Sequence, residues 1–176
     1  MGPVLALDTA TPYLVLGTQN QERTIRMGRR HAELIFSELE EFISGCGLKP
    51  ADLSAVAVGQ GPGSYTGIRI GIATATGIAH GLGIPLLGID TLAAVAARQS
   101  GEVTTVLTAG RDRVYSARYQ VGAEIITLDP PTARSAQEVV VRGCLLWDWP
   151  PSGKALAILG TRALQKGKMG IQPLYL

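Results

Sequence analysis

The sequence has few cysteines, few aromatic residues and little net charge. Its two cysteines, Cys46 and Cys144, lie far apart and form no C-x-x-C pair, so neither a disulfide framework nor a zinc site is predicted. The formal net charge is only +2 and no long run of Lys or Arg is present, whereas proteins that bind nucleic acid alone usually carry a basic stripe. We therefore expect a cytoplasmic protein that does not bind nucleic acid by itself.

Long hydrophobic runs are also missing. The apolar run near the N-terminus is too short for a signal peptide, and no stretch has the length needed to cross a membrane, so no membrane contact is predicted. Hydrophobic residues nevertheless make up 46% of the 176 positions. That content is enough for a core in one domain or in two small ones.

The most informative stretch is glycine-rich and covers residues 59–71. It follows an apolar run at 54–58 that predicts a buried strand, and it precedes a proline-free region from Thr66 to about Gly83 that predicts a helix. No lysine lies between Lys49 and Lys154, so the Walker pattern fails, and the dinucleotide fingerprint fails because its last glycine is replaced by Thr66. Two interpretations stay open, namely a tight turn without a ligand and a helix start that accepts an anion.

Small residues recur at every fourth position through the same region, at Gly63, Gly67, Gly71, Ala75, Ala79 and Gly83. Positions four apart lie on neighbouring turns of one helix face, and glycine inside a helix costs about 1 kcal/mol relative to alanine. The face therefore predicts a close approach of another element. That element is either the sheet of this protein or a second chain.

The first half predicts the order β-β-β-α-β-α-β-α. Strands are expected at 3–7, 13–18, 23–27, 54–58 and 86–89, the third nearer an edge, with helices at 30–44, 66–83 and 91–97. Asp8 and Thr9 follow the first strand, where open α/β sheets place ligands, although the same pair is also typical of a turn.

The second half is expected to begin near Ser100-Gly101. The sequence predicts strands at 104–109, 114–119, 125–127 and 155–160, a short helix at 136–142, a final helix capped by Thr161, and an extended tail at 171–176. Residues 147–153 are rich in turn formers and predict no element.

Four segments, Leu5–Pro12, His31–Leu34, Gly59–Gly71 and Gly83–Gly88, resemble the TsaB family, bacterial subunits of the machinery that makes threonylcarbamoyladenosine in tRNA. The resemblance is strong over residues 3–98 and reappears at 114–115 and 173–176. It implies the α/β actin-like ATPase (ribonuclease H-like) fold with two related β-β-β-α-β-α-β-α-type lobes. The expected lobes are residues 1–99 and a shortened second lobe, residues 100–176.

The family has a catalytic paralogue, TsaD, in which an H-x-x-x-H motif after the corresponding Gly-x-Pro strand holds a metal. Thr91 and Val95 stand at the two histidine positions here. Valine has no lone pair, and a single neutral hydroxyl is a weak ligand. We therefore expect no metal site, no catalytic residues, and neither metal-dependent transfer nor the glycoprotease activity once attached to this superfamily.

The resemblance implies a non-catalytic subunit that binds and activates TsaD and allows the ATPase TsaE to join. A homodimer is expected in isolation, and tRNA is expected to bind only through the complex. No cofactor is expected for this chain, with any ATP bound at the level of the complex. The predicted interface comprises two helices, with candidate residues His31, Leu34, Ile35, Glu38, Gly67, Gly71 and Ala75.

The alternative function is a nucleotide-binding phosphotransferase of the actin-like superfamily. Asp8 would then hold a magnesium-bound water, and the vestigial phosphate site would comprise Asp8, Thr9, Gly61, Gly63 and Ser64. Residues 108–110 read Thr-Ala-Gly, where TsaB-like chains usually read close to Asp-Ala-Arg. A carboxylate and a guanidinium are therefore expected to be missing from the interdomain cleft, which argues against this alternative.

Overall fold

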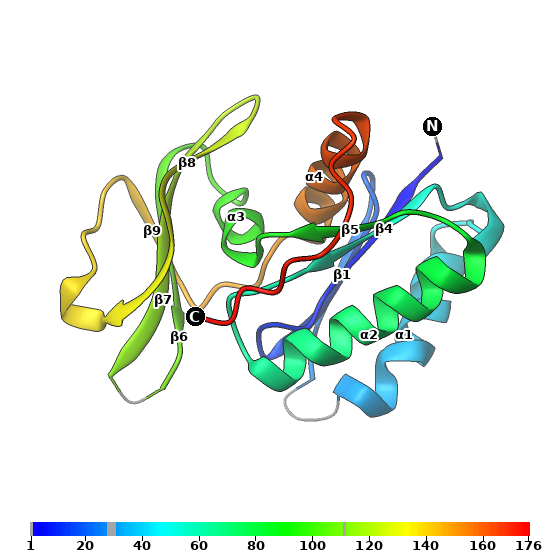
Figure 1. Cartoon of the computed structure of the whole chain (residues 1–176), viewed down its shortest axis with the longest axis horizontal. Coiled ribbons are helices and arrows are strands. Elements are labelled where there is room, and N and C mark those ends of the chain that lie inside the picture. The colour runs from blue at the N-terminus through cyan, green and yellow to red at the C-terminus, as the bar shows by residue number, and fades with distance from the viewer. Residues whose placement is uncertain (1, 28–30, 111) are drawn as a thin grey trace.

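Two β-sheets lie side by side in the structure (Figure 1). The computed structural model describes residues 2–27, 31–110 and 112–176, with residues 31–33 described by their backbone only. The first sheet has the strand order β3-β2-β1-β4-β5 and the second sheet the order β8-β7-β6-β9. Among the described residues, no helix is long and apolar enough to cross a membrane.

The first half of the chain has the predicted order of elements. Its elements are β1 (Val4–Asp8), β2 (Tyr13–Gly17), β3 (Glu22–Arg26), α1 (His31–Gly45), η1 (Pro50–Asp52), β4 (Ala55–Gly59), α2 (Tyr65–Leu82), β5 (Leu86–Ile89) and α3 (Thr91–Ala96). The short connections make β1, β2 and β3 antiparallel, as predicted, and β3 is an edge strand.

The second half repeats the pairing pattern of the first with fewer elements. It consists of β6 (Gly101–Thr108), β7 (Arg113–Val121), β8 (Ile125–Ser135), η2 (Ala136–Glu138), β9 (Cys144–Trp147) and α4 (Gly153–Gln165). Strand β6 pairs antiparallel with β7 and parallel with β9, just as β1 pairs with β2 and β4. In place of the helix that links β3 to β4, only the short η2 lies between β8 and β9.

The predicted strand at 155–160 is wrong, because these residues belong to α4. The buried positions of this helix, Gly153, Leu156, Ala157 and Gly160, have the spacing of one helix face. The helix is capped by Ser152, whose Oγ accepts a hydrogen bond from the amide of Ala155 at 3.2 Å. Thr161 is therefore an interior residue rather than the cap of a later helix.

Two further expectations for the second half need correction. The short helix predicted at 136–142 is limited to the single 3₁₀ turn η2, in which the amide of Ser135 donates to the carboxylate of Glu138 at 2.8 Å. Strand β9, which ends at Trp147, was not predicted, because four residues next to a turn-rich stretch give too little periodicity.

Helices cover both faces of the first sheet. Leu5 and Leu7 of β1 face the layer of α1 and α2, whereas Val4 and Ala6 face α4. Contact with α4 is close, since a Cβ atom built on Gly17 would lie 2.0 Å from the carbonyl oxygen of Gly153. Because β1 is buried on both faces, its sequence is continuously apolar.

Helices α3 and α4 are exchanged between the two halves. Helix α3 belongs to the range predicted for the first lobe, but Leu92 and Val95 pack on the second sheet with Tyr119. Helix α4 belongs to the range predicted for the second lobe, but Leu156 packs on the first sheet. The strands of the two sheets lie on opposite sides of the predicted division after residue 99. The helix on one face of each sheet comes from the other side of that division.

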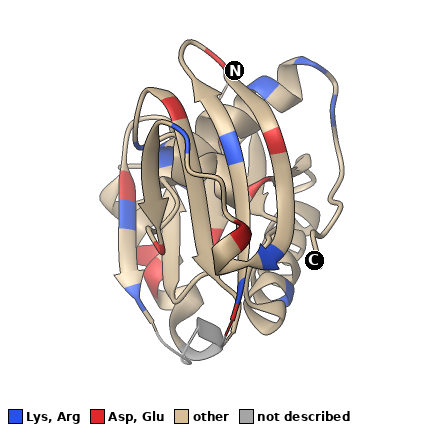
Figure 2. Cartoon of the chain, turned by 90° about the vertical axis from the view of Figure 1, so that its left-hand side faces the viewer, with Lys and Arg blue, Asp and Glu red and all other residues tan. Residues whose placement is uncertain are grey.

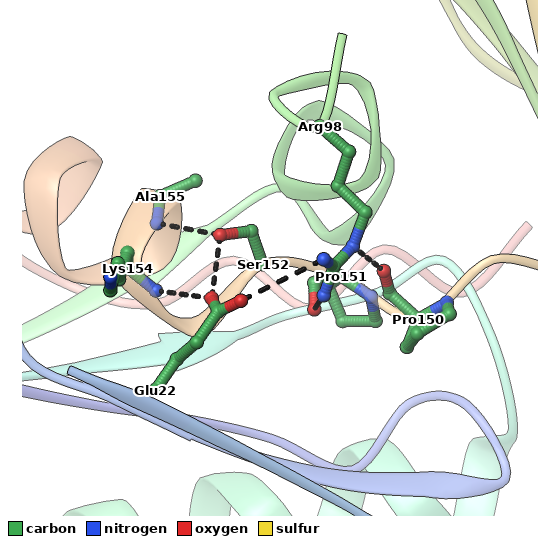
Figure 3. Close-up of polar contacts among 7 residues, drawn as sticks. All are labelled: Glu22, Arg98, Pro150, Pro151, Ser152, Lys154 and Ala155. Atoms are coloured by element: carbon green, nitrogen blue, oxygen red, sulfur yellow. Dashed lines mark hydrogen bonds and ion pairs between the residues drawn. The ribbon is translucent and has the colours of Figure 1, made fainter.

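A polar cluster ties together the segments that connect the two halves (Figure 3). Glu22 of β3 accepts hydrogen bonds from the hydroxyl of Ser152 at 2.8 Å and from the amide of Lys154 at 3.0 Å. Arg98, which follows α3, donates to the carbonyl oxygens of Pro150 and Pro151 at 2.6 and 2.8 Å, and its guanidinium lies 3.7 Å from Glu22. The cluster therefore fixes the start of α4 relative to both β3 and α3.

Candidate functional site

Several backbone amides of the glycine-rich segment between β4 and α2 donate to groups within the protein. The amide of Gly61 donates to Thr91 Oγ1 at 3.2 Å, and the amide of Ser64 donates to the carbonyl oxygen of Ala10 at 2.7 Å. Ser64 caps α2 by accepting from the amide of Gly67. A Cβ atom on Gly63 would lie 2.2 Å from the Ala10 carbonyl oxygen. Of the two interpretations left open, these contacts support a tight turn that packs against the end of β1.

Asp8 is fully buried and lies among groups of its own chain. Its carboxylate accepts hydrogen bonds from the hydroxyl of Thr91 and the amide of Ala10, each at 2.7 Å. Gly59 closes the other side, because a Cβ atom at that position would lie 1.8 Å from Asp8 Oδ2. Burial raises the pKa of Asp8 from 3.8 to about 6, against the opposing effect of the two hydrogen bonds. The carboxylate therefore lies in the interior and is bonded by groups of its own chain.

Thr91 and Val95, the two positions where the resemblance predicts the metal-binding histidines of TsaD, are both in the interior. Thr91 is fully buried and links Asp8 to the glycine loop, since its hydroxyl donates to Asp8 while accepting from Gly61. Val95 is also fully buried and packs in the core under the second sheet. Among the described residues, no group of three or more His, Cys, Asp or Glu side chains could hold a metal ion.

The small-residue face of α2 packs on the protein's own first sheet. A Cβ atom on Gly67 would lie 2.0 Å from the carbonyl oxygen of Thr9, and one on Gly71 would lie 2.5 Å from Thr9 Oγ1. That hydroxyl donates to the carbonyl oxygen of Gly67 at 2.7 Å, and Ala75 is fully buried. Of the two partners left open for this face, the structure supports internal packing. Gly67, Gly71 and Ala75 are thus not exposed to a second chain.

The candidate interface residues of α1 differ in their exposure. Ile35 is buried and Leu34 is half-buried against the first core, while Glu38 forms an ion pair with Arg23 at 2.9 Å. The side chain of His31 lies outside the described residues. Phe36, which the sequence analysis did not single out, is 63% exposed. A large apolar side chain between helix positions that face the core was the signal available for it.

A cleft of about 980 Å³ lies between the two sheets. Its walls include the turn after β1, the start of α2 and the ends of β6 and β9, with Tyr13, Arg26, Tyr65, Tyr115 and Asp148 among the lining residues. The expectation that a carboxylate and a guanidinium are missing from this cleft is wrong. Arg26 at the end of β3 and Asp148 directly after β9 supply them, which the spacing around residues 108–110 does not reveal.

Asp148 is held by the end of β6. Its carboxylate accepts from the amide and the hydroxyl of Thr108, each at 2.7 Å, and its own amide donates to the carbonyl oxygen of Val106 at 2.9 Å. Among the predicted phosphate-site residues, Gly63 and Ser64 also line the cleft, whereas Asp8, Thr9 and Gly61 do not. The structure therefore divides the predicted site between a buried network and an open cleft wall.

The charges on the outer side of the second sheet are of both signs. Figure 2 shows Lys or Arg and Asp or Glu interspersed over this side, and two ion pairs connect them, Arg118 with Glu102 at 3.2 Å and Arg134 with Asp129 at 3.1 Å. A surface of this kind lacks the single-sign field that attracts nucleic acid.

Known proteins resemble this chain in sequence. The model of the family described as TsaD, tRNA N6-adenosine threonylcarbamoyltransferase, matches residues 24–142. An uncharacterized protein of Mycobacterium tuberculosis is 35% identical over 164 residues, which cover 89% of this chain and 71% of that protein. The tRNA threonylcarbamoyladenosine biosynthesis protein TsaB of Escherichia coli is 35% identical over 127 residues, which cover 66% of this chain and 54% of that protein. The predicted resemblance to TsaB is confirmed, although the chain spans about half the length of the TsaB relatives.

Solved structures resemble the fold over its whole length. YeaZ from Pseudomonas aeruginosa superposes with a TM-score of 0.90 at 23% identity, with both chains covered in full. A crystal structure of an uncharacterized Pseudomonas aeruginosa protein with similarity to peptidase YeaZ gives a TM-score of 0.91 at the same identity and coverage. At this identity the likeness concerns the fold alone, and it confirms the predicted two-sheet α/β class.

Proposed function

Because this chain belongs to the family described as TsaD, tRNA N6-adenosine threonylcarbamoyltransferase, and is similar to TsaB proteins, we propose that it acts in forming threonylcarbamoyladenosine in tRNA as a non-catalytic partner of a TsaD subunit. Its role is to activate TsaD, which transfers the threonylcarbamoyl group from an adenylate to an adenosine of tRNA. The ATPase TsaE joins this pair, tRNA is bound through the complex, and the assembly works in the cytoplasm.

The observation that carries the proposal is the network around Thr91. In this chain the position of the first metal-binding histidine holds a hydroxyl that bonds Asp8 and the glycine loop, and the position of the second holds the core residue Val95. At these two positions, where the resemblance predicts metal ligands in the catalytic paralogue, the residues of this chain stabilise the fold.

The outer surface of α1 and α2 is the proposed docking surface for TsaD. The inner face of α2 packs on its own sheet, so the docking surface comprises exposed residues, including Phe36 of α1 and Ala73 and Gly77 of α2. A Cβ atom on Gly77 would meet nothing within 4 Å, so this part of α2 permits close approach of another helix. In the absence of TsaD, the same surface supports a homodimer.

Reconstitution tests the function. The purified chain alone should form no threonylcarbamoyladenosine from the adenylate and tRNA, and product should appear once TsaD and TsaE are added. Deleting the gene should likewise lower threonylcarbamoyladenosine in cellular tRNA. Product formation by the chain alone would contradict the proposal.

A variant pair tests the docking surface. Phe36→Asp should reduce recovery of TsaD in co-purification at least about 10-fold, because a charge would be buried at the contact. Ile126→Asp changes a residue of similar exposure on β8 and is the control, since it lies on the second sheet. Equal loss in both variants would remove the assignment of this surface.

The alternative, a nucleotide-binding phosphotransferase, gains one supporting feature from the cleft, which both Asp148 and Arg26 line. The burial of Asp8 opposes it, because this carboxylate is the residue expected to hold a magnesium-bound water. Phosphoryl transfer by the purified chain, lost in Asp148→Asn, would favour the enzyme over the partner subunit.

A further inference from the structure

The chain after α4 forms an extended strap, defined here as Gly170–Tyr175, that runs along one edge of the first sheet (Figure 1). It runs beside β5 and reaches the start of α2 at the far end. Among the described strands, β5 has no neighbour on the side away from β4, so the strap lies on the open edge of the first sheet.

The strap is held on this edge through its backbone. The amide of Gly170 donates to the carbonyl oxygen of Leu86 at 3.1 Å, and the carbonyl oxygen of Gly170 accepts from the amide of Gly88 at 2.9 Å. These bonds form a parallel bridge between Gly170 and Leu87. Backbone pairing of this type accepts any extended segment, whatever its side chains.

Two glycines and one glutamine form a seat for the strap. Gln60 binds it twice, because its Oε1 accepts from the amide of Gln172 at 3.0 Å and its carbonyl oxygen accepts from the amide of Leu174 at 2.9 Å. A Cβ atom on Gly88 would lie 2.0 Å from Gln60 Oε1 and 3.2 Å from the Cα of Ile171, and one on Gly61 would lie 3.1 Å from the carbonyl oxygen of Leu174. The seat therefore exists because neither glycine has a side chain.

An aromatic contact completes the seat at its far end. The ring centroids of Tyr175 and Tyr65 lie 5.0 Å apart, and the guanidinium of Arg69 lies 5.4 Å from the centroid of Tyr65. Tyr175 is still 51% exposed and Tyr65 58% exposed. The strap is thus held by a short series of backbone bonds, by Ile171 against the first core and by one half-exposed ring contact.

We propose that the edge of β5 with Gln60 and Tyr65 is a binding site for an extended peptide, which the strap occupies in this chain and which a partner protein can fill by displacing the strap. The matching segment has a small residue followed by an aliphatic residue, and an aromatic residue five positions after the small one, as in Gly170, Ile171 and Tyr175. Tyr65 and Arg69 make the seat continuous with the exposed side of α2. The partner is therefore the protein that docks on α2, an assignment that rests on the proposed function, whereas peptide binding itself does not.

A synthetic peptide with the sequence of residues 168–176 is the probe for this site. In the full-length variant Gly170→Pro the strap should leave its seat, because proline has no amide hydrogen and cannot adopt the φ of +110° found at Gly170. Followed by nuclear magnetic resonance, the amide signals of Gly61 and Gly88 should move in this variant and return on adding the peptide. The peptide should bind the variant at least about 10-fold more tightly than the wild-type chain, in which the tethered strap competes.

Met169→Ala is the matched control, because this side chain next to the strap is 69% exposed and its truncation should leave the wild-type signals in place. If Gly170→Pro does not fold, Tyr175→Ala provides the same measurement through loss of the ring contact. The proposal is overturned if the strap stays seated in the variant, or if about 1 mM peptide leaves the signals of the emptied seat unchanged. Failure of TsaD to bind with peptide binding intact would instead remove only the partner assignment.

Discussion

The first sheet of this protein is covered by helices on both faces, whereas described helices cover the second sheet on one face only. Helices α1 and α2 pack on one face of the first sheet and α4 on the other, while α3 packs on the inner face of the second sheet. The outer face of the second sheet has the loop after η2 beside it, where Thr104 Oγ1 donates to the carbonyl oxygen of Arg142 at 2.7 Å. Leu145 and Trp147 of β9 are each 40% exposed.

The difference arises although the two halves share one pairing pattern. Each half supplies the helix that covers the inner face of the other half's sheet, so neither sheet keeps its core without the other half. Helix α3 buries the apolar inner face of the second sheet, although α3 precedes that sheet in the chain. The first half carries its proposed docking helices on the sheet face whose counterpart in the second sheet has no described helix.

The largest expected change in the free energy of unfolding comes from a pair of substitutions, one on each sheet. Leu156→Ala should lower the free energy of unfolding by about 3 kcal/mol, because Leu156 is fully buried between α4 and the first sheet. Leu145→Ala on the outer face of the second sheet should cost less than about 1 kcal/mol. Denaturant titration of both variants measures the pair, and equal losses would show that the second sheet is covered on both faces in solution.

The free energy of unfolding should depend on pH through Asp8 at the end of β1, and a substitution at the end of β6 should not change that dependence. Asp8 has its pKa raised to about 6, so the stability that it supplies as a neutral acid is present below pH 3.8 and is lost as the pH rises through 6. The loss amounts to at most about 3 kcal/mol. Asp8→Asn should remove this slope between pH 4 and 7, whereas Thr108→Ala at the end of β6 should retain it. An unchanged slope in Asp8→Asn would mean that the carboxylate is hydrated.

Glu22, in the polar cluster that connects the two halves, should make the free energy of unfolding depend on pH with the opposite sign. Hydrogen bonds from Lys154 and Ser152 and the charge of Arg98 lower the pKa of Glu22 despite the opposing effect of burial. Its contribution is therefore present above pH 4.5 and is lost as the pH falls through the lowered value. Glu22→Gln should cost about 1 to 2 kcal/mol at pH 7 by weakening the start of α4. Thermal melts at pH 7 and at a pH well below the lowered pKa, where the carboxyl is protonated in both states, check that the variant differs from wild type mainly at pH 7.

The smallest effect concerns the two faces of α2. Gly77→Ala should raise the free energy of unfolding by at most about 1 kcal/mol, because the new methyl group meets nothing within 4 Å and glycine is a poor helix former. Gly71→Ala should destabilise instead, since its methyl group would lie 2.5 Å from Thr9 Oγ1. Stabilisation by both substitutions would contradict the packing of α2 on the first sheet.

The elements that could be predicted are those with long or repeated patterns. Helix α1 has a regular apolar face, β1 is a continuous apolar run, and the glycine loop marks the turn into α2, so all three lie close to where the sequence placed them. Helix α4 was missed because a short apolar run fits a strand and a buried helix equally well. Its helical spacing becomes decisive only when Gly153 is included with Leu156 and Gly160.

The candidate site divides in the same way. Asp8, Thr91 and the glycine loop were recognisable by residue type and by the resemblance to TsaB. Thr91 bonds Asp8, which is 83 positions away in the chain, and Gly61, which is 30 positions away. No local sequence pattern contains information on contacts this distant. The same holds for Asp148, which reaches the cleft from β9 and bonds the end of β6.

The sequence by itself determined the order of elements in the first half, the presence of Thr91 and Val95 at the two positions where the resemblance predicts histidines in TsaD, and the family to which the chain belongs. Those features reside in local periodicity and in residue chemistry, which a chain carries before it folds. Only the tertiary structure decided that α3 and α4 exchange sheets, that the small-residue face of α2 packs inward, and that Gln60 holds the strap. Each of these depends on which distant backbones come within about 4 Å of one another, and such close packing is set by the whole folded chain.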